Sequence, residues 1–134
     1  MTYLLDTSAL LVLYRKESEV DRVLALFDDP RHDILLSTVS MAEFGRKLRE
    51  LGKNQEEIEE TLDLLMQLFS RVVPLDEVVA RASLRLTDNV PLRLPMIDAL
   101  IAAALVHEAC LVHKDKHMAA IPPDVLPTLN LAQP

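Results

Sequence analysis

Hydrophobic residues along this chain fall into two kinds of segment. Short uninterrupted apolar runs are typical of strands that are covered on both faces of a sheet. Such runs lie at residues 3–5, 33–38, 72–73 and 111–112, and a last short strand is expected near 125–129. Segments with helical spacing separate them, at residues 10–27 with an interruption at 15–18, then at 39–48, 54–69, 76–85 and 95–107. This alternation predicts an α/β fold, with a parallel β-sheet of four to five strands flanked by helices on both faces.

Two of the expected helices have a recognisable apolar face. In the segment 18–27 the face consists of Val20, Val23, Leu24 and Phe27. In the segment 54–69 an apolar stripe lies opposite four glutamates between residues 56 and 60, which predicts an amphipathic helix with one solvated side. The stripe consists of Ile58, Leu62, Leu65, Met66 and Phe69. It either completes the core of the chain or is partly covered by a second chain.

Capping residues and prolines mark where several of these elements begin and end. Gly52 is a suitable C-terminal cap for the helix before it, and Asp76 is well placed to cap the next helix. Residues 87–95 contain two prolines and are expected to form a loop. Pro95 then stands in the first turn of a helix that runs to His107.

The first apolar run, at residues 3–5, ends at a carboxylate. Asp6 follows it directly, and Thr7 and Ser8 come next, before the sequence becomes apolar again. In open α/β sheets ligands bind at the carboxyl ends of the strands, so Asp6 is a candidate functional residue. Asp is also among the preferred N-caps of helices, so Asp6 has an equally good structural interpretation.

Length, composition and charge narrow the class of protein. A chain of 134 residues, half of them hydrophobic, is expected to form one domain over residues 1–134. The single cysteine, Cys110, is interpreted as a small core residue in a reducing compartment. The absence of a signal peptide and of a membrane-spanning segment predicts a cytoplasmic protein with no membrane partner. A net charge of −7 argues against broad non-specific binding to nucleic acid, but it is compatible with a metal-bound acidic site and with a basic protein partner.

Four acidic residues interrupt apolar surroundings at positions that a parallel sheet brings to one edge. They are Asp6, Glu43, Asp98 and Asp115. Each of the last three has its own structural alternative. Glu43 has Arg46 and Lys47 at helical spacing, Asp98 lies in the first turn of a helix, and Asp115 stands in a charged turn between two lysines.

Grouped carboxylates repel one another, so we expect a cation to hold them together. Oxygen ligands favour Mg²⁺ or Mn²⁺ over zinc, and such ions are the usual means of cleaving phosphodiesters. We expect Asp6, Glu43 and Asp98 to lie within bridging distance of one cation. His113 and His117 are interpreted as polar loop residues and not as zinc ligands, because the chain offers no accompanying set of cysteines or histidines.

The chain resembles a known family in four segments that together cover nearly all of it. These segments are Leu5–Leu10, Ser37–Phe44, Asp98–Ala104 and Leu111–Met118. In their order and separation they are similar to PIN-domain ribonucleases, specifically to VapC-type toxins of toxin–antitoxin pairs. The resemblance implies the PIN fold, in which strands ending in Asp6 and Asp115 are adjacent and central.

By this resemblance the chain would be an Mg²⁺-dependent ribonuclease, with Mn²⁺ as an alternative ion. The acidic residues Asp6, Glu43, Asp98 and Asp115 would bind the metal, and water on the metal would attack an RNA phosphodiester, with Thr7 or Ser8 in support. The resemblance also implies a homodimer and a cognate antitoxin that blocks the site. Two positions depart from the family pattern. His113 stands where Thr or Ser is usual, and Met118 stands where an aromatic residue is usual.

Three other functions share part of this pattern. A haloacid-dehalogenase-type phosphatase also begins with a strand and an aspartate, but it requires a second Asp where this chain has Ser8. A phosphorelay receiver requires a phosphorylated Asp after the third strand, where Pro74 and Leu75 stand. A non-catalytic PIN-like interaction module remains an alternative, and the four intact acidic residues count against it.

Overall fold

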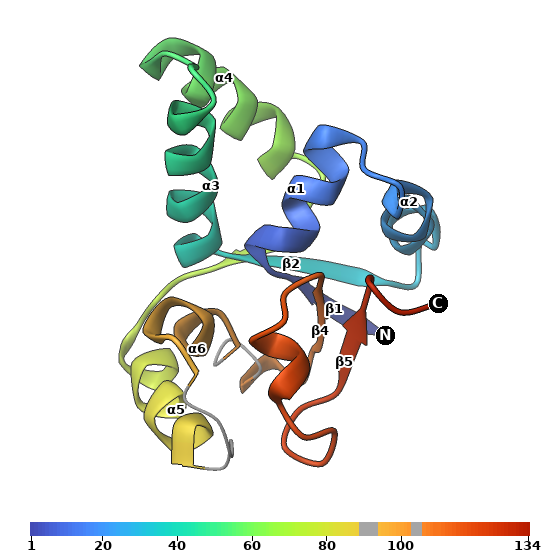
Figure 1. The fold of residues 1–134 in the computed structure, drawn as a ribbon, viewed down its shortest axis with the longest axis vertical. Coiled ribbons are helices and arrows are strands. Elements are labelled where there is room, and N and C mark those ends of the chain that lie inside the picture. Colours follow the sequence, from blue (N-terminus) through green and yellow to red (C-terminus); the bar gives the residue numbers. More distant parts are fainter. Residues whose placement is uncertain (89–93, 103–105) are drawn as a thin grey trace.

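The computed structural model describes residues 1–88, 94–102 and 106–134, and its strands form one parallel sheet. The strand order is β3-β2-β1-β4-β5, which places β1 at the centre (Figure 1). The strands are β1 (Thr2–Leu5), β2 (Asp33–Ser37), β3 (Arg71–Val73), β4 (Cys110–His113) and β5 (Thr128–Asn130). The predicted parallel α/β sheet is thereby confirmed, and the strands that precede Asp6 and Asp115 are neighbours.

Helices cover both faces of the sheet. The helices are α1 (Thr7–Arg15), α2 (Val20–Asp28), α3 (Thr38–Glu50), α4 (Gln55–Met66), α5 (Glu77–Asp88) and α6 (Met96–Ala102). Because consecutive strand residues point to opposite faces, Leu4 and Leu111 pack with α5 and α6, whereas Leu5 and Val112 pack with α1 to α4. In Figure 1, α1 and α4 lie above the sheet and α5 and α6 lie below it. The result is a three-layer arrangement with one apolar core on each face of the sheet.

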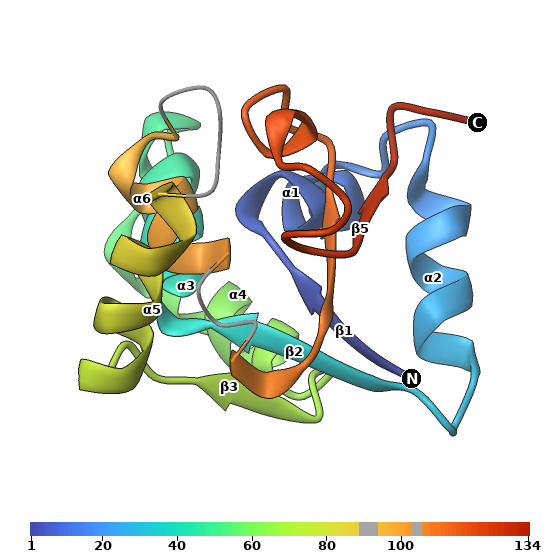
Figure 2. The ribbon, with the colours of Figure 1, turned by 90° about the horizontal axis from the view of Figure 1, so that it is seen from below.

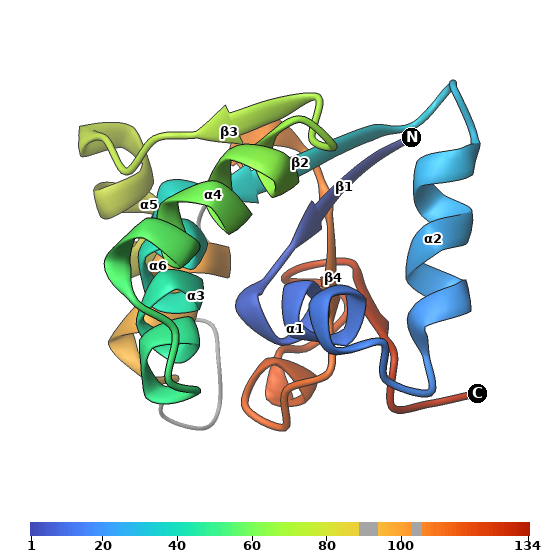
Figure 3. The same cartoon turned by 90° about the horizontal axis from the view of Figure 1, so that it is seen from above.

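The interruption predicted between the first two helices is present. Helix α1 ends at Arg15, its C-cap Lys16 adopts a left-handed conformation with φ of 52°, and α2 begins at Val20. The predicted face of α2 was partly wrong, because Leu24 is 43% exposed and Leu26 is buried instead. Helix α2 lies at the end of the molecule opposite α5 and α6 (Figures 2 and 3). It therefore contacts the core along a narrow stripe, which Val23 and Leu26 provide.

Most of the predicted helix ends are close to those in the structure. Helix α3 ends with Leu51 as its C-cap, and the next residue, Gly52, has φ of 90°, a left-handed conformation that glycine adopts without strain. Asp76 caps α5 as expected, because its Oδ1 accepts a hydrogen bond from the Val79 amide at 3.0 Å. Helix α5 nevertheless runs on through Thr87 and Asp88, which were expected in a loop.

Parts of two predicted segments lie outside the described residues. These parts are residues 89–93 of the expected loop and residues 103–105 of the helix expected to reach His107. The first two turns of that helix are confirmed as α6. None of the helices in the described ranges is long and apolar enough to span a membrane. Cys110 is buried in β4, in agreement with its interpretation as a core residue.

Candidate metal centre at the carboxyl edge of the sheet

Asp6 lies where β1 ends, and its side chain caps α1. Its backbone amide donates to the Val112 carbonyl at 3.0 Å and so continues the pairing of β1 with β4. Its Oδ1 accepts hydrogen bonds from the Ala9 amide at 2.9 Å and from the Ser8 hydroxyl at 2.6 Å. Asp6 is only 2% exposed, and this burial raises the pKa of its carboxyl to about 7, although both hydrogen bonds act to lower it. The charges of Asp115 and Asp98 raise the pKa further.

Ser8 and Lys114 join the loop after β1 to the loop after β4. The Ser8 hydroxyl donates to Asp6 and accepts a hydrogen bond from the Lys114 amide at 2.8 Å. The Lys114 ammonium lies 3.0 Å from Glu17 and 2.9 Å from Glu19, in the connection between α1 and α2. One of the two lysines beside Asp115 is therefore directed at other carboxylates. The neighbouring Thr7 hydroxyl is buried, with no hydrogen-bond partner among the described residues.

Asp98, Asp115 and His117 form the closest group of potential ligand atoms among the described residues. One carboxylate oxygen of each aspartate and Nδ1 of His117 all lie within 4.8 Å of one another. The Nδ1 atom is 3.3 Å from Oδ1 of Asp115 and 3.6 Å from Oδ2 of Asp98. The turn holds two of these residues together, because the His117 amide donates to Oδ1 of Asp115 at 2.6 Å.

Glu43 approaches this group from α3. Burial raises the pKa of Asp98 to about 6, the charges of Asp115 and Glu43 raise it further, and His117 acts in the opposite direction. Glu43 lines a groove of about 370 Å³ between α3 and α6, whose lining also includes Ile97, the residue before Asp98. The alternative partners proposed for Glu43 are engaged elsewhere, since Arg46 and Lys47 both contact Glu50.

The two departures from the family pattern, His113 and Met118, are both core residues. His113 ends β4 and is fully buried, so its interpretation as a polar loop residue was wrong. Its Nδ1 accepts a hydrogen bond from the Asp115 amide at 3.2 Å, and burial lowers its pKa, so the ring is neutral. Met118 is also fully buried, in the core on the α5 and α6 face. Both residues fix the turn that carries Asp115.

The structure therefore brings the four predicted acidic residues to one edge of the sheet, although the distances between them differ. Asp98 and Asp115 lie closest together, the charges of both raise the pKa of Asp6, and the charge of Glu43 raises the pKa of Asp98. A single cation shared by Asp6, Glu43 and Asp98 stays a prediction. His117 was not predicted to join the group, although its position two residues after Asp115 was a usable signal.

This set of donors fits a divalent cation. Asp6 and Asp98 have raised pKa values because burial and neighbouring carboxylates disfavour their charges, and the ion pairs of Asp98 and Asp115 between described residues are both with His117. Carboxylate oxygens with one imidazole suit Mg²⁺, Mn²⁺ or a related ion, and a divalent charge would relieve the repulsion.

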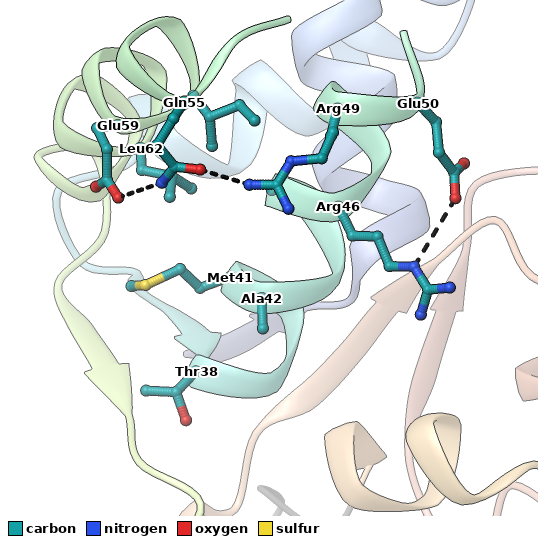
Figure 4. A pocket seen from close by; sticks show the side chains of 11 residues that line it. Thr38, Met41, Ala42, Arg46, Arg49, Glu50, Gln55, Glu59 and Leu62 are labelled. Atoms are coloured by element: carbon teal, nitrogen blue, oxygen red, sulfur yellow. Dashed lines mark hydrogen bonds and ion pairs between the residues drawn. The ribbon is translucent and has the colours of Figure 1, made fainter. Parts of the chain in front are cut away.

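A second groove, of about 740 Å³, lies between α3 and α4. Its apolar lining comes from Met41, Ala42, Gly45, Ile58 and Leu62. Its polar rim includes Arg49, which bonds to Gln55, which in turn donates to Glu59 at 2.9 Å (Figure 4). This groove shares Ala42, Arg46 and Glu50 with the smaller groove that Glu43 lines. The two grooves are thus neighbours around α3.

Solved structures of toxin–antitoxin proteins share this fold. VapBC2 from Rickettsia felis, bound to a promoter DNA fragment, is 20% identical, with 97% of this chain and 98% of that chain covered and a TM-score of 0.76. FitAcB from Neisseria gonorrhoeae is 23% identical, with full coverage of both chains and a TM-score of 0.74. VapBC-1 from nontypeable Haemophilus influenzae is 20% identical, with 99% and 100% covered and a TM-score of 0.76.

Comparison of the amino-acid sequence with known protein families gives evidence that does not depend on these structural similarities. No curated protein matches the chain. Residues 3–122 match the PIN domain, a region that includes Asp6, Glu43, Asp98 and Asp115 together with strands β2, β3 and β4 and most of β1. The chain therefore belongs to the PIN domain family.

Proposed function

We propose that the chain is a metal-dependent endoribonuclease and the toxin of a type II toxin–antitoxin pair. The observation that carries the proposal is the group of Asp6, Asp98 and Asp115 at the carboxyl edge of a PIN domain, where burial and neighbouring carboxylates raise the pKa of Asp6 and of Asp98. Such a group is stable in its ionised form only beside a cation. Among PIN-like possibilities, this arrangement favours a nuclease over a module that only binds partners.

Each residue of the site has a distinct task in this proposal. Asp98 and Asp115 would hold Mg²⁺ or Mn²⁺, with Asp6 and Glu43 completing the acidic surroundings. When bound, the ion supplies positive charge that makes a water molecule more acidic and stabilises the leaving oxygen of a phosphodiester. Ser8 positions Asp6 and joins it to the turn that carries Asp115, through its bond to the Lys114 amide. Thr7 supplies a buried hydroxyl next to Asp6.

The phosphatase alternative is less compatible with the geometry. It requires an acid–base aspartate two residues after Asp6, and that position is Ser8. The Ser8 hydroxyl is occupied in a structural link between two loops. We therefore expect RNA and not a small phosphomonoester to be the substrate.

Purified chain should cleave single-stranded RNA in Mg²⁺ or Mn²⁺ and lose this activity in excess EDTA. Asp6→Asn and Asp98→Asn should each lower the cleavage rate at least ~100-fold, because each removes a metal-directed charge. Asp76→Asn is the matched control, since Asp76 also caps a helix but lies outside the acidic group. Gel assays with folding checked by circular dichroism measure these effects.

Two outcomes would contradict the ribonuclease. Cleavage that survives EDTA would exclude the metal mechanism. Hydrolysis of phosphomonoesters without cleavage of RNA would favour the phosphatase.

A protein inhibitor is the second part of the proposal. The structural neighbours are toxin–antitoxin proteins, and the groove between α3 and α4 offers an apolar floor with a charged rim to a segment of a partner. The net charge of −7 favours a basic inhibitor, whose association it would accelerate. Expression of the chain in bacterial cells should arrest growth, and a neighbouring gene product should restore it. Growth arrest by Asp98→Asn to the same extent would show that the arrest does not depend on the acidic site.

Two further features complete the proposal. We propose a homodimer, because leucines of α4 and the segment after it remain exposed after the apolar stripe has entered the core. We also propose that the protein acts in the cytoplasm, where its RNA substrate is found.

A further inference from the structure

We propose that His117 is a nitrogen ligand of the divalent cation, so that this centre combines nitrogen and oxygen ligands and binds Mn²⁺ in preference to Mg²⁺. The inference rests on the metal site of the proposed function. It goes beyond the all-carboxylate set that the four acidic residues define. Its basis is the position of the imidazole, because Nδ1 of His117 lies close to a carboxylate oxygen of both Asp98 and Asp115.

The distances agree with ligands around one ion. Ligand atoms about 2.1 Å from an ion are separated by roughly 3.0 Å when they are neighbours in an octahedron and by about 4.2 Å when they are opposite. Nδ1 of His117 lies 3.3 Å from Asp115 and 3.6 Å from Asp98, and all three ligand atoms lie within 4.8 Å of one another. A cation can therefore occupy the space between them with only small side-chain movements.

The turn after β4 holds the imidazole in this position from several sides. The His117 amide bonds to Asp115, and the Ala119 amide bonds to the Asp115 carbonyl at 3.1 Å. The following residue, Met118, is fully buried and anchors the turn in the core. Asp115 and His117 thus lie on one short, anchored turn, whereas Asp98 faces them from α6. The His117 side chain is 46% exposed, which leaves the ion accessible to water and substrate.

An ion pair between a protonated His117 and the two aspartates is the simpler explanation of the same contacts. A protonated imidazole would bring one positive charge to this site. The electrostatic potential there is made negative by four carboxylates, those of Asp6, Glu43, Asp98 and Asp115. A divalent cation would bring two positive charges, and it would bind Nδ1 of a neutral imidazole at the position that the ring already has. The same positions of Nδ1 and the two carboxylates are therefore compatible with direct binding of a cation.

Ligand type decides which ion such a site prefers. Imidazole nitrogen binds first-row transition ions well, whereas Mg²⁺ strongly prefers oxygen. Removal of the imidazole should therefore weaken Mn²⁺ binding much more than Mg²⁺ binding. An all-oxygen site would lose little of either affinity.

Mn²⁺ titration of the full-length, metal-free protein, followed by electron paramagnetic resonance, tests this inference. The wild-type complex should show hyperfine coupling to a directly bound nitrogen in the pulsed spectrum. His117→Gln should abolish this coupling and weaken Mn²⁺ binding about tenfold or more, with a change of less than about threefold in Mg²⁺ affinity measured by competition. His107→Gln is the matched control, because His107 is a partly buried histidine at the other end of β4, bonded to Arg71.

The possible failures are distinguishable. Mn²⁺ bound without nitrogen coupling, or coupling that persists in His117→Gln, would overturn the role of His117 and leave the metal-dependent nuclease intact. Absence of Mn²⁺ binding by the wild-type protein would overturn the ligand and the proposed metal site together. Circular dichroism of the metal-free His117→Gln protein establishes that its fold is retained.

Discussion

Asp6 is both a helix cap and a buried charge. Its Oδ1 accepts two hydrogen bonds that the amide oxygen of an asparagine can also accept, so its role as a cap does not require the charge. The charge itself is unfavourable in the metal-free fold, because burial and the charges of Asp115 and Asp98 raise the pKa to about 7. Retention of such a residue is expected where the charge serves binding or catalysis.

Metal-free protein should lose stability as pH rises from about 4 to 7. In that range the unfolded chain has an ionised Asp6, whereas the folded chain still binds the proton, so unfolding releases a proton and becomes easier. The shift from 3.8 to about 7 corresponds to an upper limit of roughly 4 kcal/mol. Asp6→Asn should therefore melt at least about 5 °C higher than wild type at pH 8 in EDTA and show a smaller difference at pH 4.

Asp98 contributes in the same direction, since its pKa is raised to about 6, so the Asp6→Asn variant retains part of the pH dependence. Asp76→Asn again serves as the control, and its melting temperature should stay within about 2 °C of wild type. A decrease in the stability of Asp6→Asn at pH 8 would show that the charge stabilises the fold, contrary to this account.

Helix α4 owes its start to local sequence. The Asn54 side chain accepts a hydrogen bond from the Glu57 amide at 2.9 Å, and the Glu57 side chain accepts one from the Asn54 amide at 3.0 Å, which completes a capping box. The apolar stripe of the helix packs against the core on the α1 face, which is the intramolecular role considered from the sequence.

Asn54→Ala should lower the free energy of unfolding by about 1 kcal/mol, because the Glu57 amide in the first turn of α4 loses its side-chain acceptor. Chemical denaturation measures the change. Thr61→Ala in the same helix is the control, because Thr61 donates only to the Glu57 carbonyl and alanine has the higher helix propensity. An equal loss in both variants would indicate that packing, and not the cap, determines the stability of this helix.

At the scale of the whole molecule, the exposed apolar residues and the net charge determine how the protein associates with other chains. Leu64 in α4 is 68% exposed, and Leu68 in the turn after α4 is 50% exposed. On the opposite layer, Leu84 of α5 is 69% exposed. The net charge of −7 keeps copies apart at long range, so self-association must come from apolar contact.

Light scattering at micromolar concentration should give a mass twice the 15.1 kDa of the chain. Leu64→Glu should shift the protein toward monomer if the α4 side forms the interface, because a charge would then be buried without a partner. Leu84→Glu is a control of equal exposure on α5. A monomer at all concentrations would reject the homodimer.

Local sequence was sufficient to predict the order of the elements and much of the fold. The apolar runs that became β1, β2 and β4 are recognisable because strands covered on both faces need no polar alternation. The ends of elements were also predictable where a single side chain caps them, as Asp76 does for α5. The face of α2 was not predictable, because the position of a helix relative to the sheet decides whether Leu24 or Leu26 is buried.

The acidic residues of the candidate site and the sheet edge that they share could be proposed from the sequence, but the distances between their side chains could not. Asp6, Glu43, Asp98 and Asp115 stand out because each follows a strand or interrupts an apolar segment. Their relative distances depend on the turn after β4 and on the approach of α6, which bring His117 and not Glu43 next to Asp98. Sequence thus determined which acidic residues stand after a strand or within an apolar segment, whereas only tertiary packing decided which of their atoms meet, because side chains that are distant along the chain converge through the sheet and its loops.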